Sequence, residues 1–314
     1  MIEFKDVDVV FGKQPERAVP LLDQGMSRND ILSKTGLTAA VRNASLSVSK
    51  GEICVLMGLS GSGKSSLLRT ANGLNPITRG EVRLETDQGM QNFLALDEAE
   101  KRKVRMERIT MVFQKFALMP WLTVAQNVAF GLEQKGLEKS QVRDRVMHQL
   151  DLVGLTQWAK KRPSELSGGM QQRVGLARAL AMETDIILMD EPFSALDVLT
   201  AENLRSDLLD LWQARKVKNR TSGMIFVTHN IEEAAVLADR IIIFDSDPGC
   251  IRSELSVSLP HPRDEQSLRF RGVVDDIYTL MTTQATLGAD TEKYKDIGIG
   301  YRLPDVEISE LIGL

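Results

Sequence analysis

The sequence has few of the residues that mark several classes of protein. Its 314 residues include only two cysteines, Cys54 and Cys250, and Cys54 lies in an apolar stretch, so reduced thiols rather than a disulfide framework are expected. A net charge of −4 and a pI near 5.6 argue against nucleic acid as the main partner. No apolar run approaches the roughly 18 residues that a membrane-spanning helix needs, and no signal peptide precedes Met1. We therefore expect a cytosolic chain of one large domain and a modest appendage, with any membrane association made through a partner.

A glycine-rich loop lies between a predicted strand and a predicted helix. The apolar residues 53–57 indicate a strand buried on both faces, GLSGSGKS follows at residues 58–65, and a helix should begin near Lys64. Glycines let the backbone N–H groups of such a loop point at a phosphate chain, beside the positive end of the helix. We expect Lys64 to reach the β- and γ-phosphates and the Ser65 hydroxyl to bind Mg²⁺. The residues assigned to this phosphate site are Gly58, Ser60, Gly61, Ser62, Gly63, Lys64, Ser65 and Ser66.

A second glycine-bearing site, LSGGM, occupies residues 166–170. It stands just before residues 171–181, whose apolar side chains recur at helical spacing, so Ser167, Gly168 and Gly169 are expected at a helix N-terminus. Such an end attracts anions. One nucleotide cannot occupy two distant sites of one subunit, unless two copies of the chain pair.

Candidate catalytic residues follow two further predicted strands. Residues 184–189 lead to Asp190 and Glu191, and residues 223–228 lead to His229. Ligands bind at the carboxyl ends of strands in parallel α/β sheets. We expect Asp190 to hold Mg²⁺, and Glu191 to orient or deprotonate a water molecule, facing the opposite way from Asp190 if the strand geometry continues.

The order of these motifs resembles the ATP-binding cassette family, the motor subunits of ABC transporters, over residues 1–245. GLSGSGKS matches the Walker A motif, Gln114 in VFQK the Q-loop, LSGGM the signature, IILMDE at 186–191 the Walker B motif, SALD at 194–197 the D-loop and His229 the switch histidine. The resemblance implies a head-to-tail homodimer with ATP between the P-loop of one copy and the signature of the other. His229 would then contact the γ-phosphate, Asp197 would communicate across the dimer, and Gln114 would join Ser65 and Asp190 at the metal.

The resemblance also implies an α/β fold with an N-terminal antiparallel β subdomain, a RecA-like parallel-sheet core and an inserted α-helical subdomain at about residues 115–180. Transmembrane permease subunits would bind after Gln114, where residues 116 and 118–121 are apolar; packing inside the subdomain is the alternative. Phe11 is the candidate for stacking on adenine, although it is equally explained as a core residue. The protein would lie at the cytoplasmic face of the membrane and serve a solute-binding protein indirectly.

Two segments bear on the transported solute. An insertion at about residues 14–38, in which Ser27 can cap a short helix, looks like a segment of choline, glycine betaine and proline betaine importer motors. Residues 246–314, a connector with an accessory or regulatory piece, instead resemble the tail of nitrate, sulfonate and taurine importer motors. They include a possible helix at 265–283, and residues 288–314 are explained almost equally by a solvated tail. The sequence therefore predicts an importer motor, most simply for a quaternary amine, with the nitrate type as the alternative and a soluble cassette ATPase as a more distant one.

Overall fold

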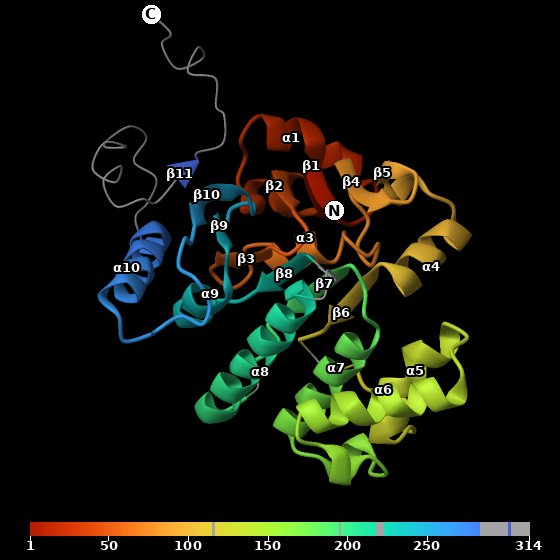
Figure 1. The fold of residues 1–314 in the computed structure, drawn as a ribbon. Coiled ribbons are helices and arrows are strands. Elements are labelled where there is room, and N and C mark those ends of the chain that lie inside the picture. Colours follow the sequence, from red (N-terminus) through yellow and green to blue (C-terminus); the bar gives the residue numbers. More distant parts are fainter. Residues whose placement is uncertain (115–116, 195, 218–222, 283–300, 303–314) are drawn as a thin grey trace, which may run out of the picture.

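The computed structural model describes residues 1–114, 117–194, 196–217, 223–282 and 301–302, and two β-sheets organise it (Figure 1). The larger sheet has the strand order β11-β10-β9-β3-β8-β7-β6. Its five central and right-hand strands run parallel. They are β6 (Ile109–Val112), β7 (Ile186–Asp190), β8 (Gly223–Val227), β3 (Ile53–Gly58) and β9 (Arg240–Phe244). The three strands predicted from apolar runs are thus confirmed as β3, β7 and β8.

Residues of β3 alternate between two hydrophobic cores because successive side chains of a strand point to opposite faces of the sheet. Ile53, Val55 and Met57 pack into the core that the helices cover. Cys54 and Leu56 pack into the core beneath the antiparallel sheet. All six residues of β3 are buried, which explains why the sequence shows no polar alternation there.

The smaller sheet is antiparallel, with the order β2-β1-β4-β5. Its strands are β1 (Ile2–Phe11), β2 (Thr38–Val48), β4 (Arg79–Thr86) and β5 (Gly89–Asn92). It shares its core with the short helix α3 (Lys64–Leu68). The expected antiparallel N-terminal part is therefore present, and the turn Phe93–Ala95 with α4 (Glu98–Glu107) leads from it to β6.

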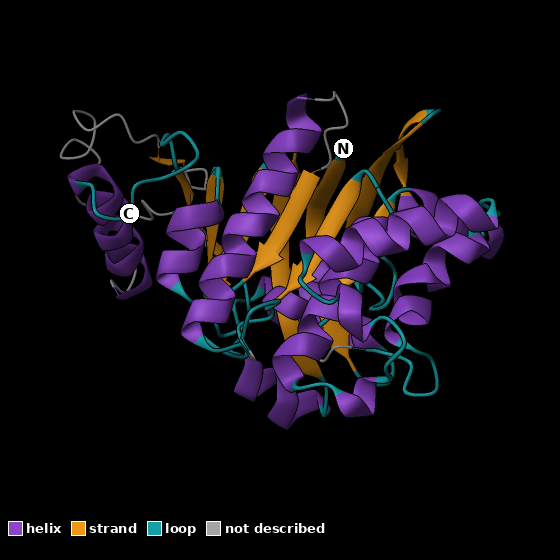
Figure 2. Cartoon of the chain, turned by 60° about the horizontal axis from the view of Figure 1, so that its bottom comes forward, coloured by secondary structure: helices purple, strands orange, loops and turns teal. Residues whose placement is uncertain are grey.

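The other face of the parallel sheet is covered by α8 (Val198–Val217), α9 (Ile231–Leu237) and α10 (Leu268–Thr282), together with Leu176, Ala179 and Leu180 of α7 (Gly168–Ala181). In Figure 2 the strands pass through the middle of the molecule with helices around them. Strand β10 (Ile251–Ser256) follows β9, pairs with it in antiparallel orientation and leads to α10. Helix α10 confirms the helix that was predicted within residues 265–283. The prediction for residues 288–314 lies outside the described residues, apart from β11 (Tyr301–Arg302).

Helices α5 (Val124–Gln134), α6 (Lys139–Leu152) and α7 (Gly168–Ala181) pack around a separate core, joined by short turns at Thr156–Trp158 and Pro163–Glu165. This cluster lies to one side of the sheets (Figure 1). In the apolar segment after Gln114, Leu118 packs against the cluster, so packing accounts for part of that segment, whereas the Trp121 side chain is 68% exposed. Phe116 lies outside the described residues. Within the described ranges, no helix has both the length and the apolar character that crossing a membrane requires.

The insertion is a folded unit that packs on the end of the β1–β2 hairpin. It contains the turn Pro15–Ala18, α1 (Val19–Asp23) and α2 (Arg28–Thr35). Leu22 and Ile31 form a small core with side chains of β1 and β2. Ser27 caps α2 by accepting a hydrogen bond of 3.1 Å from the Asp30 N–H, as the sequence predicts.

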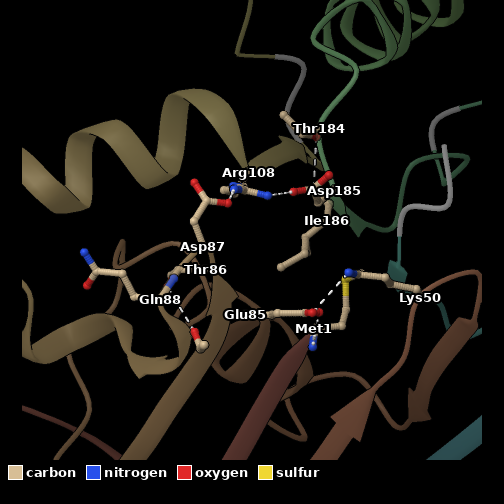
Figure 3. Close-up of polar contacts among 11 residues, drawn as sticks. Met1, Lys50, Glu85, Thr86, Asp87, Gln88, Arg108, Thr184, Asp185 and Ile186 are labelled. Atoms are coloured by element: carbon tan, nitrogen blue, oxygen red, sulfur yellow. Dashed lines mark hydrogen bonds and ion pairs between the residues drawn. The ribbon is translucent and has the colours of Figure 1, made fainter.

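Ion pairs join the two sheets at the amino ends of the parallel strands (Figure 3). The Arg108 guanidinium, just before β6, lies 2.6 Å from the Asp185 carboxylate before β7 and also binds Asp87 in the β4–β5 turn. Nearby, Glu85 of β4 pairs with Lys50 and with the N-terminal amine, each at 3.1 Å. Each of these charged groups has a partner of opposite charge, and Arg108 connects a turn of the smaller sheet to the larger sheet. The role of these contacts is to stabilise the packing of the two sheets.

Candidate nucleotide site

The loop after β3 has the backbone that a phosphate-binding loop requires. Gly58, Gly61 and Gly63 have φ values of 151°, 78° and 89°, in the region that favours glycine. A Cβ on Gly63 would lie 2.3 Å from the carbonyl oxygen of Ala40, and one on Gly58 would lie 2.6 Å from that of Phe244. Both positions therefore exclude a side chain on two grounds. Helix α3 begins at Lys64, which confirms the predicted start.

Lys64 is held inside the loop. Its side chain is 4% exposed, and its Nζ donates hydrogen bonds to the carbonyls of Gly58 and Leu59 and to the Ser62 hydroxyl, at 2.8–3.0 Å. Burial lowers the pKa of the Lys64 ammonium below its ordinary value, although nearby carboxylates partly oppose this. The three acceptors are neutral, so the charge remains available to a phosphate chain.

Asp190 ends β7 directly beneath the loop. Its carboxylate is fully buried, accepts a hydrogen bond of 2.6 Å from the Ser65 hydroxyl and lies 2.9 Å from the Arg69 guanidinium. A hydroxyl and a carboxylate are hard oxygen ligands, and Mg²⁺ takes one or two such protein groups together with phosphate oxygens and water. Among the described residues no group of three or more His, Cys, Asp and Glu side chains is placed to hold a metal. The pairing of the Ser65 hydroxyl with the Asp190 carboxylate is a donor set that fits Mg²⁺ bound together with a nucleotide.

Glu191 connects two other predicted residues. Its carboxylate accepts a hydrogen bond of 2.9 Å from the Gln114 amide and lies 3.5 Å from Nδ1 of His229, whose side chain is 62% exposed. The expectation that strand geometry continues through Glu191 is wrong, because β7 ends at Asp190 and Glu191 has φ 47°. Such a left-handed backbone is uncommon outside glycine and is frequent at functional sites.

One cavity of about 350 Å³ gathers most of the predicted residues. Phe11, at the end of β1 and 37% exposed, lies on its wall and is therefore not a core residue. Asp190 and His229 each contact a residue that lines the cavity: Asp190 accepts a hydrogen bond from Ser65, and His229 lies beside Glu191. Its lining residues are Phe11, Arg28, Thr38, Ala40, Ser60, Gly61, Ser62, Gly63, Lys64, Ser65, Ser66, Gln114 and Glu191.

The second glycine-bearing site lies apart from this cavity. Ser167 caps α7 by accepting a hydrogen bond from the Met170 N–H, so Gly168 and Gly169 begin that helix as predicted. Asp197 precedes α8 and accepts a hydrogen bond of 3.0 Å from the Thr200 N–H. Hydrogen bonds from the Thr200 side chain and from this N–H lower the pKa of the Asp197 carboxyl. None of these predicted residues is among the described residues that line the cavity.

The sequence did not indicate four residues of the site. Arg28, Thr38 and Ala40 line the cavity but belong to the insertion and to β2, far from any motif. Arg69 lies five positions after Lys64 and reaches Asp190 only because α3 stands over the end of β7. Only tertiary structure brings these residues to the loop, so no local pattern could have identified them.

Known proteins match the sequence and the fold. The family described as ABC transporter matches residues 41–194. The glycine betaine/proline betaine transport system ATP-binding protein ProV of Escherichia coli (strain K12) is 45% identical over 245 residues, which are 78% of this chain and 59% of ProV. The nitrate import ATP-binding protein NrtD of Synechocystis sp. is 38% identical over 236 residues, 73% of this chain and 79% of NrtD. The chain thus spans less than two thirds of the length of ProV.

Among solved structures, a dimeric post-hydrolysis state of the ATP-binding cassette MJ0796 bound to ADP and Pi superposes with a TM-score of 0.67 at 32% identity. The match covers 83% of this chain and all of that one. The fold, the motif order and these identities agree, and the chain belongs to the ABC transporter family of ATP-binding proteins.

Proposed function

We propose that the chain is the ATP-hydrolysing subunit of an ABC importer for a small solute. The observation that carries the proposal is the convergence of three sets of groups at one edge of the parallel sheet. They are the Lys64 ammonium within the loop, the Ser65–Asp190 pair, and Glu191 with its two neighbours Gln114 and His229. Phosphoryl transfer depends mainly on positioning and charge neutralisation, and these groups supply both.

Each group then has a definite task. Ser65, Asp190 and Gln114 hold Mg²⁺, which neutralises charge on the phosphate oxygens when it is bound. Lys64 leaves its carbonyl acceptors for the β- and γ-phosphates. Glu191 orients or deprotonates the attacking water, and His229, exposed at 3.5 Å from Glu191, contacts the γ-phosphate.

The active unit in this proposal is a head-to-tail homodimer. Ser167, Gly168 and Gly169 present the N-terminus of α7, but away from the cavity of their own copy, so a partner's nucleotide is the ligand that suits them. Asp197 stands next to Val198 and Leu199, which are 78% and 71% exposed and available to a second copy. The dimeric state of MJ0796 with ADP and Pi supports this arrangement by similarity.

We divide the chain into a nucleotide-binding domain at 1–245, with the helical cluster at about 115–180, and a C-terminal segment at 246–314. Permease subunits are proposed to dock beside the segment after Gln114, where Trp121 is exposed. The subunit would then lie at the cytoplasmic face of the membrane through those partners and serve a solute-binding protein indirectly.

The proposed solute is a quaternary amine such as glycine betaine or choline. Support comes from the higher identity to ProV than to NrtD over alignments of similar length. A test is uptake of labelled glycine betaine, choline, taurine and nitrate by cells that express the chain with its permease and binding protein. We expect cells with the parent chain to take up glycine betaine or choline, and we expect Lys64→Ala to abolish this uptake. Uptake of nitrate or taurine alone would refute the proposed quaternary-amine solute. The proposed function itself would be refuted if the purified chain, together with its permease, had no Mg²⁺-dependent ATPase activity.

A further inference from the structure

Arg28, the first residue of α2, connects the insertion to the phosphate loop. Its Nε donates to the Ala39 carbonyl at 2.9 Å, its Nη1 to the Gly61 carbonyl at 2.9 Å and its Nη2 to the Ala40 carbonyl at 3.4 Å. Two of these acceptors belong to β2 and the third to the loop itself. A residue 33 positions before Gly61 therefore helps to fix the orientation of a loop peptide.

The same junction includes the turn after β9. The Asp247 carboxylate accepts a hydrogen bond of 2.6 Å from the Arg28 N–H, and the Gly249 N–H donates to the Ala40 carbonyl at 3.1 Å. Ala40 is also the residue whose carbonyl would touch a Cβ on Gly63. The insertion, β2, the loop and the C-terminal turn thus meet within hydrogen-bond distance, which makes the position of Arg28 well defined.

The Arg28 guanidinium still has hydrogen-bonding capacity. It carries five N–H donors, and the three bonds to carbonyls leave one N–H on each terminal nitrogen. Within the described part of the chain no carboxylate forms an ion pair with this guanidinium, and Arg28 lines the 350 Å³ cavity together with Lys64. The Arg28 guanidinium is thus a partly exposed cation whose present partners are neutral oxygens and which keeps two N–H donors. Such a group is suited to binding an anion.

We propose that Arg28 is a nucleotide-binding residue, contacting the α-phosphate and ribose end of the bound nucleotide. This proposal rests on the proposed function, which places a nucleoside triphosphate in the cavity. Gln114 and Glu191 bond to each other beside the proposed γ-phosphate, whereas Arg28 bonds to Ala39, the neighbour of Thr38, which pairs with Phe11 between β1 and β2. The insertion therefore supplies a contact to the part that ADP and ATP have in common.

The test measures the affinity of the full-length purified chain for ADP and for a non-hydrolysable ATP analogue. Arg28→Gln removes the charge but keeps an amide that can bind the carbonyls. It is expected to weaken both ligands by the same factor, on the order of tenfold, the usual effect of losing a hydrogen bond to a charged group. Arg28→Ala should lose at least as much, and Arg28→Lys should recover part of the loss. Arg17→Ala, at an exposed arginine of the same insertion, is the matched control and should bind like the parent chain.

A second measurement separates binding from folding. Thermal unfolding without ligand reports the structural effect of each variant, and the rise in melting temperature on adding ADP reports the contact, since this rise depends on affinity. Arg28→Gln with the parental affinity and the parental ADP-induced rise would overturn the proposal while leaving the proposed function intact. A parent chain that binds neither nucleotide would instead overturn the proposed function itself.

Discussion

Replacing Gly63 by alanine should destabilise the chain more than the same replacement at Gly61 in the same loop. Gly63 has φ 89°, a left-handed conformation that costs an L-residue about 1–2 kcal/mol. A Cβ there would also lie 2.3 Å from the Ala40 carbonyl oxygen, a contact that only a backbone shift can relieve. Forcing such an overpacked contact costs about 1–3 kcal/mol. The two effects act together at Gly63, for an expected loss of about 2–5 kcal/mol.

The controls separate the two effects. Gly61 has φ 78° but nothing within 4 Å of its Cβ position, so Gly61→Ala carries only the backbone strain, about 1–2 kcal/mol. Gly249 does not have a left-handed φ, but its Cβ would lie 2.0 Å from the Ser62 carbonyl oxygen, so Gly249→Ala carries only the clash, about 1–3 kcal/mol. All three positions belong to or touch the same loop.

Thermal unfolding without nucleotide is the assay, followed by circular dichroism. At about 2–4 °C of melting temperature for each kcal/mol in a large domain, Gly61→Ala should lower the midpoint by about 2–8 °C and Gly63→Ala by clearly more. A midpoint for Gly63→Ala below that of Gly61→Ala is the result that the structure demands, whereas Gly249→Ala, whose Cβ would lie 2.0 Å and 2.7 Å from two carbonyl oxygens, reports the clash alone. A Gly63→Ala chain no less stable than Gly61→Ala would show that the loop relaxes freely and would refute the reasoning.

Three further predictions follow from the site and the core. Glu191→Gln should keep ATP binding and accumulate a nucleotide-bound dimer by size-exclusion chromatography while turnover falls about 10²–10⁴-fold, the usual contribution of a general base; parental turnover would remove Glu191 from that role. Ser167→Arg should bind ATP as an isolated chain but lose ATPase activity, and undiminished activity would contradict a shared site. Burial raises the pKa of the Cys54 thiol to about 12, above its unfolded value. Its contribution to stability is therefore complete below about pH 9 and lost as the pH rises from 9 toward 12, so the melting temperature of Cys54→Val should fall less over that range than that of the parent chain.

The parts that the sequence predicted correctly depend on local patterns. The run around Cys54 and Leu56 is apolar at every position because both faces of β3 are buried, and a run of this kind can be recognised without knowing what covers it. The start of α3 at Lys64 was recognisable from the glycine-rich loop before it, and the helix N-terminus near Ser167 from the helical spacing of apolar residues at 171–181.

The parts that the sequence could not predict depend on contacts between distant segments. Arg28 reaches Gly61 only because the insertion folds onto β1 and β2 through its own small core. Arg69 reaches Asp190 only because α3 lies above the end of β7. The conformation of Glu191 is a third case, since the backbone turns into the left-handed region where a simple strand would have continued. Such features are decided by tertiary packing and by function rather than by local preference.

The two edges of the parallel sheet use their charges differently. At the amino edge, Arg108 binds two carboxylates, and Arg240 at the start of β9 lies 2.7 Å from Glu52 and 3.1 Å from Glu254. Among the described residues, both of these arginines therefore have carboxylate partners. The Arg108–Asp87 pair connects the two sheets, and cations paired in this way leave little charge for a ligand.

At the carboxyl edge two cations have neutral partners instead. Lys64 and Arg28 bind carbonyl and hydroxyl oxygens, whereas Arg69 pairs with the Asp190 carboxylate. Positive groups fixed in place without carboxylate partners lose little when an anion arrives, because few existing interactions must be broken. The same rigid sheet thus supplies a neutralised edge that maintains the fold and an edge with preorganised cations, which suits the phosphate chain of the proposed nucleotide.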